Sequence, residues 1–79
     1  MTKGKSKYVN RNETGLAIYN AIKDSGYSQV QIAHKMGISP IMISRWATGR
    51  HIPDIDSLAG LADTLGVNID TLIIRKKHS

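Results

Sequence analysis

The residues best suited to specific recognition lie on one short segment, residues 40–45. Ile41 and Arg45 are four residues apart, so they stack on one side if the segment is helical. The planar guanidinium of Arg45 can donate two parallel hydrogen bonds to paired acceptors such as O6 and N7 of guanine. Pro40 and Ile41 can offer only apolar contact, and Ser44 can donate or accept a hydrogen bond. Together these side chains are suited to recognising the surface of another molecule.

No group of residues has the composition or spacing of a catalytic or metal site. The chain has no cysteine, and its histidines, His34, His51 and His78, stand apart. No pair of histidines has the spacing that places two metal ligands on one helix face. We therefore predict that the protein is not an enzyme and needs no metal or other cofactor.

Two short helices joined by a tight turn are predicted to carry the recognition residues. Ser28 can cap the first helix, because its hydroxyl can accept from an N–H of the first turn while Gln31 reaches back to the Ser28 N–H. Gly37 favours the end of that helix, since glycine readily adopts the left-handed conformation of a C-terminal cap. Ser39 can cap the second helix, with Pro40 at its first position.

The second of these helices, which Gly49 is predicted to close, has an apolar side and an outward side. Ile43, Trp46 and Ala47 fall on one side and are expected to pack inward. The residues left facing outward are Ser39, Pro40, Ile41, Ser44, Arg45 and Thr48, with Met42 beside them.

Three further helices are predicted around this pair. The first runs from residue 13 or 14 to residue 25, and the fourth begins after a cap at Asp54 and ends at Gly66. The fifth begins near Ile69 after a cap at Asn68, although a short strand over residues 72–74 is an alternative, because β-branched residues dominate there. The apolar residues assigned to the helices outside the recognition segment are Leu16, Ile18, Tyr19, Ala21, Ile22, Val30, Ile32, Ala33, Met36, Ile55, Leu58, Ala59, Leu61, Ala62, Leu65, Leu72, Ile73 and Ile74.

The basic residues are concentrated at the two ends of the chain. The net charge is +5, and residues 75–79 carry three cations without an acid. We predict a flexible basic arm over residues 1–12, one folded domain over residues 13–74 and a basic tail over residues 75–79. The arm cations that could contact an anionic partner are Lys3, Lys5, Lys7 and Arg11. On charge alone, solubility is an equally good explanation for these cations.

The composition indicates a single small helical domain. The chain has 79 residues, 41% of them hydrophobic, with no phenylalanine and one tryptophan. Its core must therefore consist mainly of leucine, isoleucine, valine and alanine, as suits helices packing on helices. No apolar run approaches the roughly 20 residues of a membrane-spanning helix. We expect a cytoplasmic protein with no membrane partner.

The spacing of capping, small and apolar residues resembles the helix-turn-helix signature of the lambda-repressor-like DNA-binding domains. The resemblance covers roughly residues 14–74, with the helix-turn-helix at about residues 28–49. The sequence departs from the family pattern at Ala47, where an acidic residue is frequent, and at residues 40–42, where polar side chains are common. The matching positions are Ser28, Gln29, Ala33, Gly37, Ile38, Ser39, Ile43, Ser44, Arg45, Trp46, Gly49, Pro53, Leu58, Leu61, Ala62, Leu65, Gly66, Val67 and Leu72.

The resemblance implies an all-α, five-helix domain that binds double-stranded DNA, with the second helix of the motif in the major groove. The side chains that would read bases are Pro40, Ile41, Ser44 and Arg45. The residues that would bind backbone phosphates are Gln29, Ser39, Thr48 and Arg50. The chain length leaves no room for an effector domain, so the resemblance implies a small Cro-like repressor of phage or bacterial origin.

Two further expectations concern protein partners. Outward-facing Ile41 and Met42 would also suit an interaction module that binds another regulator, as an antirepressor or antitoxin does. A single reading helix touches only about half a turn of DNA, so we also expect a weak homodimer on a palindromic operator. The candidate dimer surface consists of Ile69, Leu72, Ile73 and Ile74.

Overall fold

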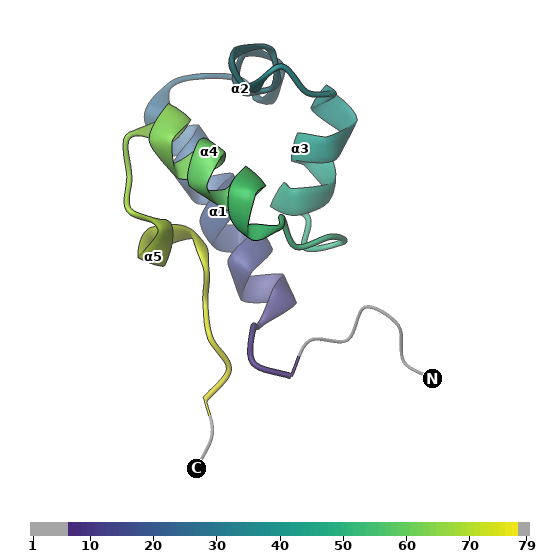
Figure 1. Cartoon of the computed structure of the whole chain (residues 1–79), viewed down its shortest axis with the longest axis vertical. Helices are drawn as coiled ribbons and strands as arrows, with labels where there is room; N and C mark the ends of the chain where they lie inside the picture. The colour runs from purple at the N-terminus through teal and green to yellow at the C-terminus, as the bar shows by residue number, and fades with distance from the viewer. Residues whose placement is uncertain (1–6, 78–79) are drawn as a thin grey trace.

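The computed structural model describes residues 7–77, which form five helices (Figure 1). The five-helix, all-α fold predicted from the sequence is confirmed. Lys3, Lys5 and His78 lie outside the described residues. The helices are α1 (Arg11–Ser25), α2 (Gln29–Met36), α3 (Pro40–Ala47), α4 (Ile55–Leu65) and α5 (Ile69–Leu72).

Side-chain caps fix where four of the helices begin, α1 among them. Ser28, Ser39 and Asp54 precede α2, α3 and α4, and each side chain accepts a hydrogen bond from an N–H of the first turn. The capping box predicted for α2 is present in full. Gly37 and Gly66 end α2 and α4 in the left-handed conformation, as predicted. Local sequence therefore determines where α2 and α3 begin and where α2 ends, whereas α3 ends at Ala47 with Thr48 as its C-cap, just before the predicted Gly49.

The start of α1 differs from the prediction. The helix begins at Arg11, earlier than the expected residue 13 or 14, because Asn10 Oδ1 accepts from the N–H of Glu13 at 3.0 Å. Arg11 and Asn12, which the sequence assigns to the basic arm, are part of the first helical turn.

α5 is a single turn followed by extended backbone. A helix beginning at Ile69 is confirmed, and Leu72, which the alternative strand would include, is its last residue. Ile73 is extended, with φ −110° and ψ 123°. Asn68 precedes the helix but makes no side-chain capping hydrogen bond.

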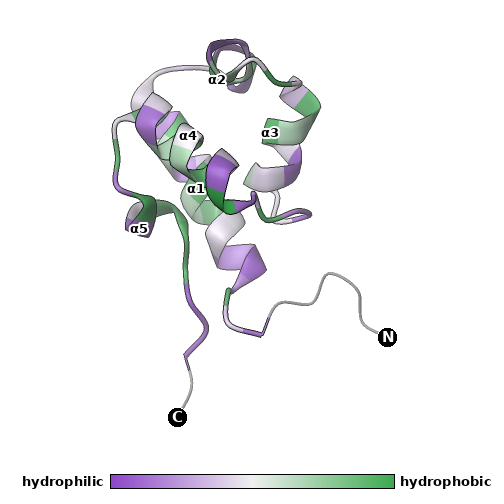
Figure 2. Ribbon diagram, viewed as in Figure 1, coloured by the Kyte–Doolittle hydropathy of each residue, from purple (hydrophilic) through white to green (hydrophobic). Residues whose placement is uncertain are grey.

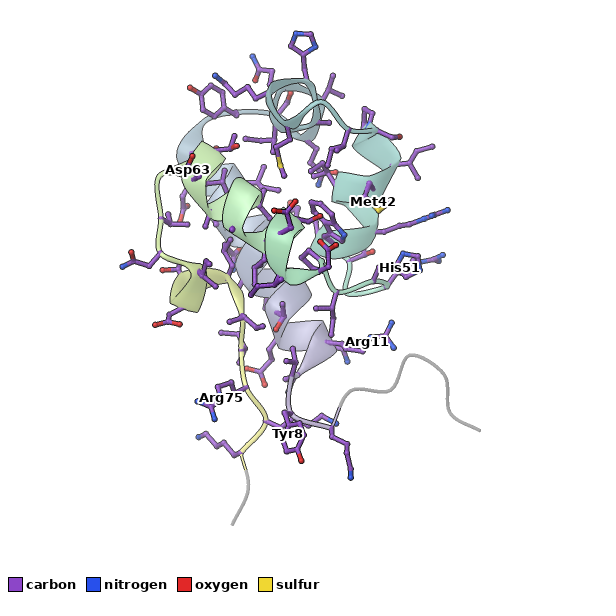
Figure 3. The ribbon with its side chains drawn as sticks, in the orientation of Figure 1. Tyr8, Arg11, Met42, His51, Asp63 and Arg75 are labelled. Atoms are coloured by element: carbon purple, nitrogen blue, oxygen red, sulfur yellow. The ribbon has the colours of Figure 1, made fainter. Side chains whose placement is uncertain are left out.

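The segment after α5 pairs with the segment before α1 in antiparallel fashion. Asn10 N donates to Ile74 O at 2.8 Å, and Lys76 N donates to Tyr8 O at 2.7 Å. The side chain of buried Thr14 extends this pairing, because its hydroxyl accepts from Ile74 N at 2.9 Å and donates to Ile74 O at 3.3 Å. Figure 3 shows Tyr8 and Arg75 together at this end of the molecule.

The other helices pack around α1 and α4 (Figure 1). α3 packs on α1 and α2, and α5 packs on α1 and α4. Each of the longer helices carries both hydrophobic and hydrophilic residues, as expected for helices with one buried side (Figure 2). The buried apolar core consists of Ile18, Ile22, Ile32, Ala33, Ile43, Trp46, Ala47, Leu58, Leu61, Ala62 and Leu72.

Five residues assigned to apolar helix faces are exposed instead, namely Leu16, Tyr19, Val30, Ile55 and Ala59. In α1 the buried positions are Thr14, Gly15, Ile18 and Ile22, a stripe that Leu16 and Tyr19 miss. Ile55 is 76% exposed because it is the first residue of α4, while the buried residues of that helix begin at Leu58. The apolar pattern therefore located the helices correctly, but it assigned to their buried sides some residues that are exposed.

The backbones of α1 and the loop after α3 are in direct contact through two glycines. We call residues 48–51 the α3 exit loop. A Cβ built on Gly15 would lie 2.5 Å from Gly49 N, and a Cβ built on Gly49 would lie 2.8 Å from Arg11 O. Gly49 also has φ +76°, which disfavours any other residue. Neither position can accept a side chain without separating α1 from the exit loop.

Gly15→Ala should destabilise the protein, although alanine is the better helix former. Overpacking costs about 1–3 kcal/mol, and the gain in helix propensity returns at most about 1 kcal/mol. Urea unfolding should therefore show a net loss of up to about 2 kcal/mol. The matched control is Gly60→Ala in α4, where the new Cβ would meet only the flexible end of Met36 at 3.4 Å. A gain for both variants would refute the contact.

Candidate nucleic-acid interface

α3 has one buried and one exposed side, divided as the sequence predicts. Ile43 is 0%, Trp46 4% and Ala47 7% exposed, so these residues hold the helix against the core. Ile41 is 63% exposed on the opposite side. The predicted outward residues are all exposed: Ser39, Pro40, Ile41, Ser44, Arg45 and Thr48, together with Met42.

An open hollow of about 440 Å³ on the outward side of α3 brings together five of the predicted site residues. Three of them, Ile41, Ser44 and Arg45, are predicted to read bases, and two, Thr48 and Arg50, to bind phosphate. Pro40, Ser39 and Gln29 do not line this hollow. Apolar surface and hydrogen-bond donors are therefore combined on one face, as contact with base edges and phosphates requires.

The two hydroxyl groups at the ends of α3 differ in what they can still donate. Ser39 Oγ accepts from Ile41 N at 3.2 Å, so its own proton remains available to an acceptor. Thr48 Oγ1 donates toward Ser44 O at 2.9 Å and Arg45 O at 3.2 Å. Because a phosphate oxygen can only accept, Thr48 could serve it only after giving up these hydrogen bonds.

The backbone of the α3 exit loop is hydrogen-bonded to the carbonyl of Arg45. The N–H groups of Arg50 and His51 both donate to Arg45 O, at 2.9 Å and 3.2 Å. The backbone of Arg50 is therefore hydrogen-bonded to the end of α3, while its side chain is exposed.

The start of α2 offers backbone donors beside Gln29. Ser28 Oγ accepts from Gln31 N at 3.1 Å, and Gln31 Oε1 accepts from Ser28 N at 2.8 Å. Among residues 7–77, none accepts from the N–H groups of Gln29 and Val30. These N–H groups lie at the positive end of a helix dipole, so they suit a phosphate oxygen.

The charges around α3 differ between its two sides. A second hollow of about 380 Å³ lies between α3 and the start of α4, lined by Met42, His51 and Asp54 among others. Hydrogen bonds from Ser57, from its hydroxyl first and then from its N–H, lower the pKa of the Asp54 carboxyl below its ordinary value. Asp54 is therefore ionised at neutral pH and repels phosphate. An anionic partner is favoured on the other side, which carries Arg45 and Arg50.

Lys35 is the third cation within residues 27–50, besides Arg45 and Arg50, and it contacts an aromatic ring. Its Nζ lies 4.9 Å from the centroid of Tyr27, a cation–π contact. Both residues also line a hollow of about 400 Å³ on α2, with Val30, Gln31 and His34. Lys35 thus belongs to the surface of α2 and does not line the hollow beside α3.

The cations predicted for the basic arm have different surroundings. Lys7 is exposed, while Lys3 and Lys5 lie outside the described residues. Arg11 lies in the first turn of α1, and its guanidinium donates a hydrogen bond to the backbone carbonyl of Arg50. The sequence did not reveal this contact, because its two partners are 39 positions apart and the acceptor is a backbone atom.

The residues predicted for a dimer surface are largely used by the fold itself. Leu72 is 0% exposed and belongs to the core, so it offers no surface to a partner. Ile69 and Ile73 are partly buried against that core. Ile74 is half-buried, and its backbone N–H and carbonyl are both bonded to Thr14.

The described residues contain neither a metal cluster nor a membrane-spanning helix. Within residues 7–77, no three histidine or acidic side chains are grouped so that they could hold a metal ion. In the same part of the chain no helix has both the length and the apolarity needed to cross a bilayer.

Known proteins resemble this chain in both sequence and fold. The model of the helix-turn-helix family matches residues 18–72. A proposed DNA-binding protein from Bacteroides fragilis is 29% identical, with a TM-score of 0.70 over 73% of this chain and 94% of that one. The clp gene regulator ClgR from C. glutamicum is 27% identical, with a TM-score of 0.72 over 78% of this chain and 82% of that one. None of the curated proteins matches.

The match to the family model extends from the middle of α1 to the end of α5. The fold and the α2–α3 pair define the chain as a helix-turn-helix protein. It belongs to the Cro/C1-type helix-turn-helix family of DNA-binding transcription regulators. Such regulators are typically not enzymes.

Two isoleucines of α3 provide a test of how this helix is oriented. Ile43→Ala should lower the free energy of unfolding by about 2–5 kcal/mol, because it removes a fully buried side chain. Ile41→Ala should change it by no more than about 0.5 kcal/mol, since Ile41 is 63% exposed. Urea denaturation measures both values. Similar losses for the two variants would mean that Ile41 is covered by protein.

Proposed function

We propose that this protein binds a specific sequence of double-stranded DNA and represses transcription by occupying its site against RNA polymerase. The observation that carries the proposal is the outward side of α3, on which Arg45 and Arg50 share a hollow with exposed Ile41. With this side in the major groove, the first turns of α3 meet base edges. We further propose that it is a small Cro-like regulator of phage or bacterial origin, because the α2–α3 pair belongs to the Cro/C1-type helix-turn-helix family.

Four residues of α3 would read the bases. Arg45 would donate two hydrogen bonds to O6 and N7 of a guanine, and Ser44 would donate to or accept from a neighbouring base. Pro40 and Ile41 would contact thymine methyl groups, because they have no side-chain donor or acceptor.

Phosphate contacts would fix the orientation of α3 without selecting a sequence. Gln29 would bind one phosphate together with the N–H groups that begin α2. Ser39 and Arg50 would bind phosphates near the two ends of α3, each with a donor that can reach outward. Thr48 is the weakest of the four candidates, because its hydroxyl already donates within α3.

We also propose that two copies bind a palindromic operator, since one α3 spans only about half a turn of DNA. With Leu72 in the core, the surface that would remain for such a weak homodimer is the exposed part of Ile69, Ile73 and Ile74. Selection of bound duplexes from a random pool, followed by sequencing, tests both proposals. Enriched inverted repeats support the dimer, and a single enriched half-site contradicts it.

The competing function is a protein-interaction module that binds another regulator, such as an antirepressor or antitoxin. Exposed Ile41 and Met42 favour it, because α3 presents more apolar surface than DNA backbone contact requires. Failure of the random pool to yield any enriched sequence would favour this alternative over DNA reading.

Arg45→Lys tests whether Arg45 reads a base. Lysine keeps the charge but loses the planar pair of donors, so binding to the best site should weaken by about 1–3 kcal/mol. The preference at one base pair should relax, while nonspecific affinity stays nearly unchanged. Repeated selection with the variant measures this, with Arg50→Lys as the control that should leave every preference intact. An unchanged selected site would assign Arg45 to the backbone or to a protein partner.

Replacing Lys3, Lys5 and Lys7 together by glutamine tests the proposed arm contacts. Substitution is preferable to deleting residues 1–10, because Asn10 caps α1 and Tyr8 pairs with Lys76. Binding to all duplexes should weaken alike, and the slope of log affinity against log salt should flatten by about 0.9 per lost phosphate contact. A triple lysine-to-arginine variant should keep the original slope. An unchanged slope for the glutamine variant would identify these lysines as solubility charges.

A further inference from the structure

We propose that Arg11 is a positioning residue that acts through Arg50, and that it is not an arm cation with its own DNA contact. The inference rests on the proposed DNA binding, because the group that it positions is a candidate phosphate ligand. Figure 3 shows Arg11 extending from α1 toward the side of the molecule on which His51 of the exit loop also lies.

The backbone of Arg50 is held at both of its polar groups. Its N–H donates to Arg45 O at the end of α3, at 2.9 Å. Its carbonyl accepts from the Arg11 guanidinium in the first turn of α1. The peptide groups on either side of the Arg50 Cα are thereby fixed between two helices, so the side chain of Arg50 leaves from a set position.

The place of Arg11 in α1 is unfavourable unless the side chain serves another element. It is the first residue of the helix, where the dipole disfavours a positive charge. The hydrogen bond to the Arg50 carbonyl uses the cation where the Gly15–Gly49 contact already brings the two backbones together. Replacing Arg11 with a neutral residue should therefore not weaken α1 itself, so effects on the exit loop can be separated from fraying of the helix.

The first measurement needs no DNA. Amide hydrogen exchange of Arg50 and His51, whose N–H groups bind Arg45 O, reports how firmly the exit loop is held. In Arg11→Gln these two amides should exchange about tenfold faster, since a hydrogen bond from a charged donor is lost. Arg11→Lys should retain part of the protection. The matched control Lys7→Gln removes the same charge from an exposed neighbouring position and should change neither amide.

The second measurement is a double-mutant cycle on DNA affinity. Arg11→Gln and Arg50→Ala should each weaken binding by up to about tenfold. Each should also flatten the slope of log affinity against log salt by about 0.9, the value of one phosphate contact. If Arg11 acts through Arg50, adding Arg11→Gln to Arg50→Ala should cost less than about a further twofold. Lys7→Gln and Arg50→Ala should instead weaken binding independently, as separate contacts do.

Two results would overturn the proposal. Unchanged exchange at Arg50 and His51 in Arg11→Gln would mean that Arg11 does not hold the loop. If the double variant lost affinity by the product of the two single losses, Arg11 would bind a phosphate itself. If the unmodified chain bound no duplex, the proposed function would fail, whereas the exchange rates would still decide whether Arg11 holds the exit loop.

Discussion

The position of α3 depends on the direct backbone contact between α1 and the α3 exit loop. Because Gly15 and Gly49 have no Cβ, their backbones approach so closely that an added Cβ would lie 2.5 Å from Gly49 N. The exit loop is also bound to the carbonyl of Arg45, so the end of α3 and the first turn of α1 form one unit. α3 has only eight residues, so this contact adds to the packing of its three buried residues, Ile43, Trp46 and Ala47, in setting its orientation. Any displacement of this contact would move the outward side of α3 as a whole.

The sequence predicts those features of the fold that are encoded locally. Ser28, Ser39 and Asp54 begin their helices because a cap involves atoms only two or three residues away. Prediction from the sequence fails where the position of a residue depends on a partner that is distant in the chain. Thr14 is polar, so apolar periodicity would not place it in the core, yet it is buried there in α1. Its burial is possible because its hydroxyl hydrogen-bonds to both the N–H and the carbonyl of Ile74, 60 positions away. The antiparallel pairing of the segments before α1 and after α5, which uses the backbone of Ile74, is hidden from the sequence for the same reason.

The candidate site shows the same division. The exposed side of α3 could be predicted, since Ile43 and Trp46 fix which side of so short a helix is buried. The hydrogen-bonding state of its residues could not. Thr48 and Ser39 look equivalent in the sequence, yet only Ser39 retains a proton for an outside acceptor. Similarly, the charge of Arg11 suggests an arm cation until the carbonyl of Arg50 is seen to accept from it. Residue type gives the chemistry that is possible, and the fold decides which atoms are still available for it.

The composition of the outward side also limits how affinity and specificity can be divided. Of the four proposed base readers, Pro40 and Ile41 have no hydrogen-bonding side chain, so discrimination by paired hydrogen bonds would fall chiefly on Arg45. Apolar contact with thymine methyls distinguishes bases less sharply, because a mismatch then leaves no buried polar group unpaired. Affinity would have to come largely from phosphates, through Gln29, Arg50 and the cations at the ends of the chain. Since phosphate contacts carry no sequence information, a domain with so few polar base readers gains specificity most directly by placing two copies of α3 on one operator.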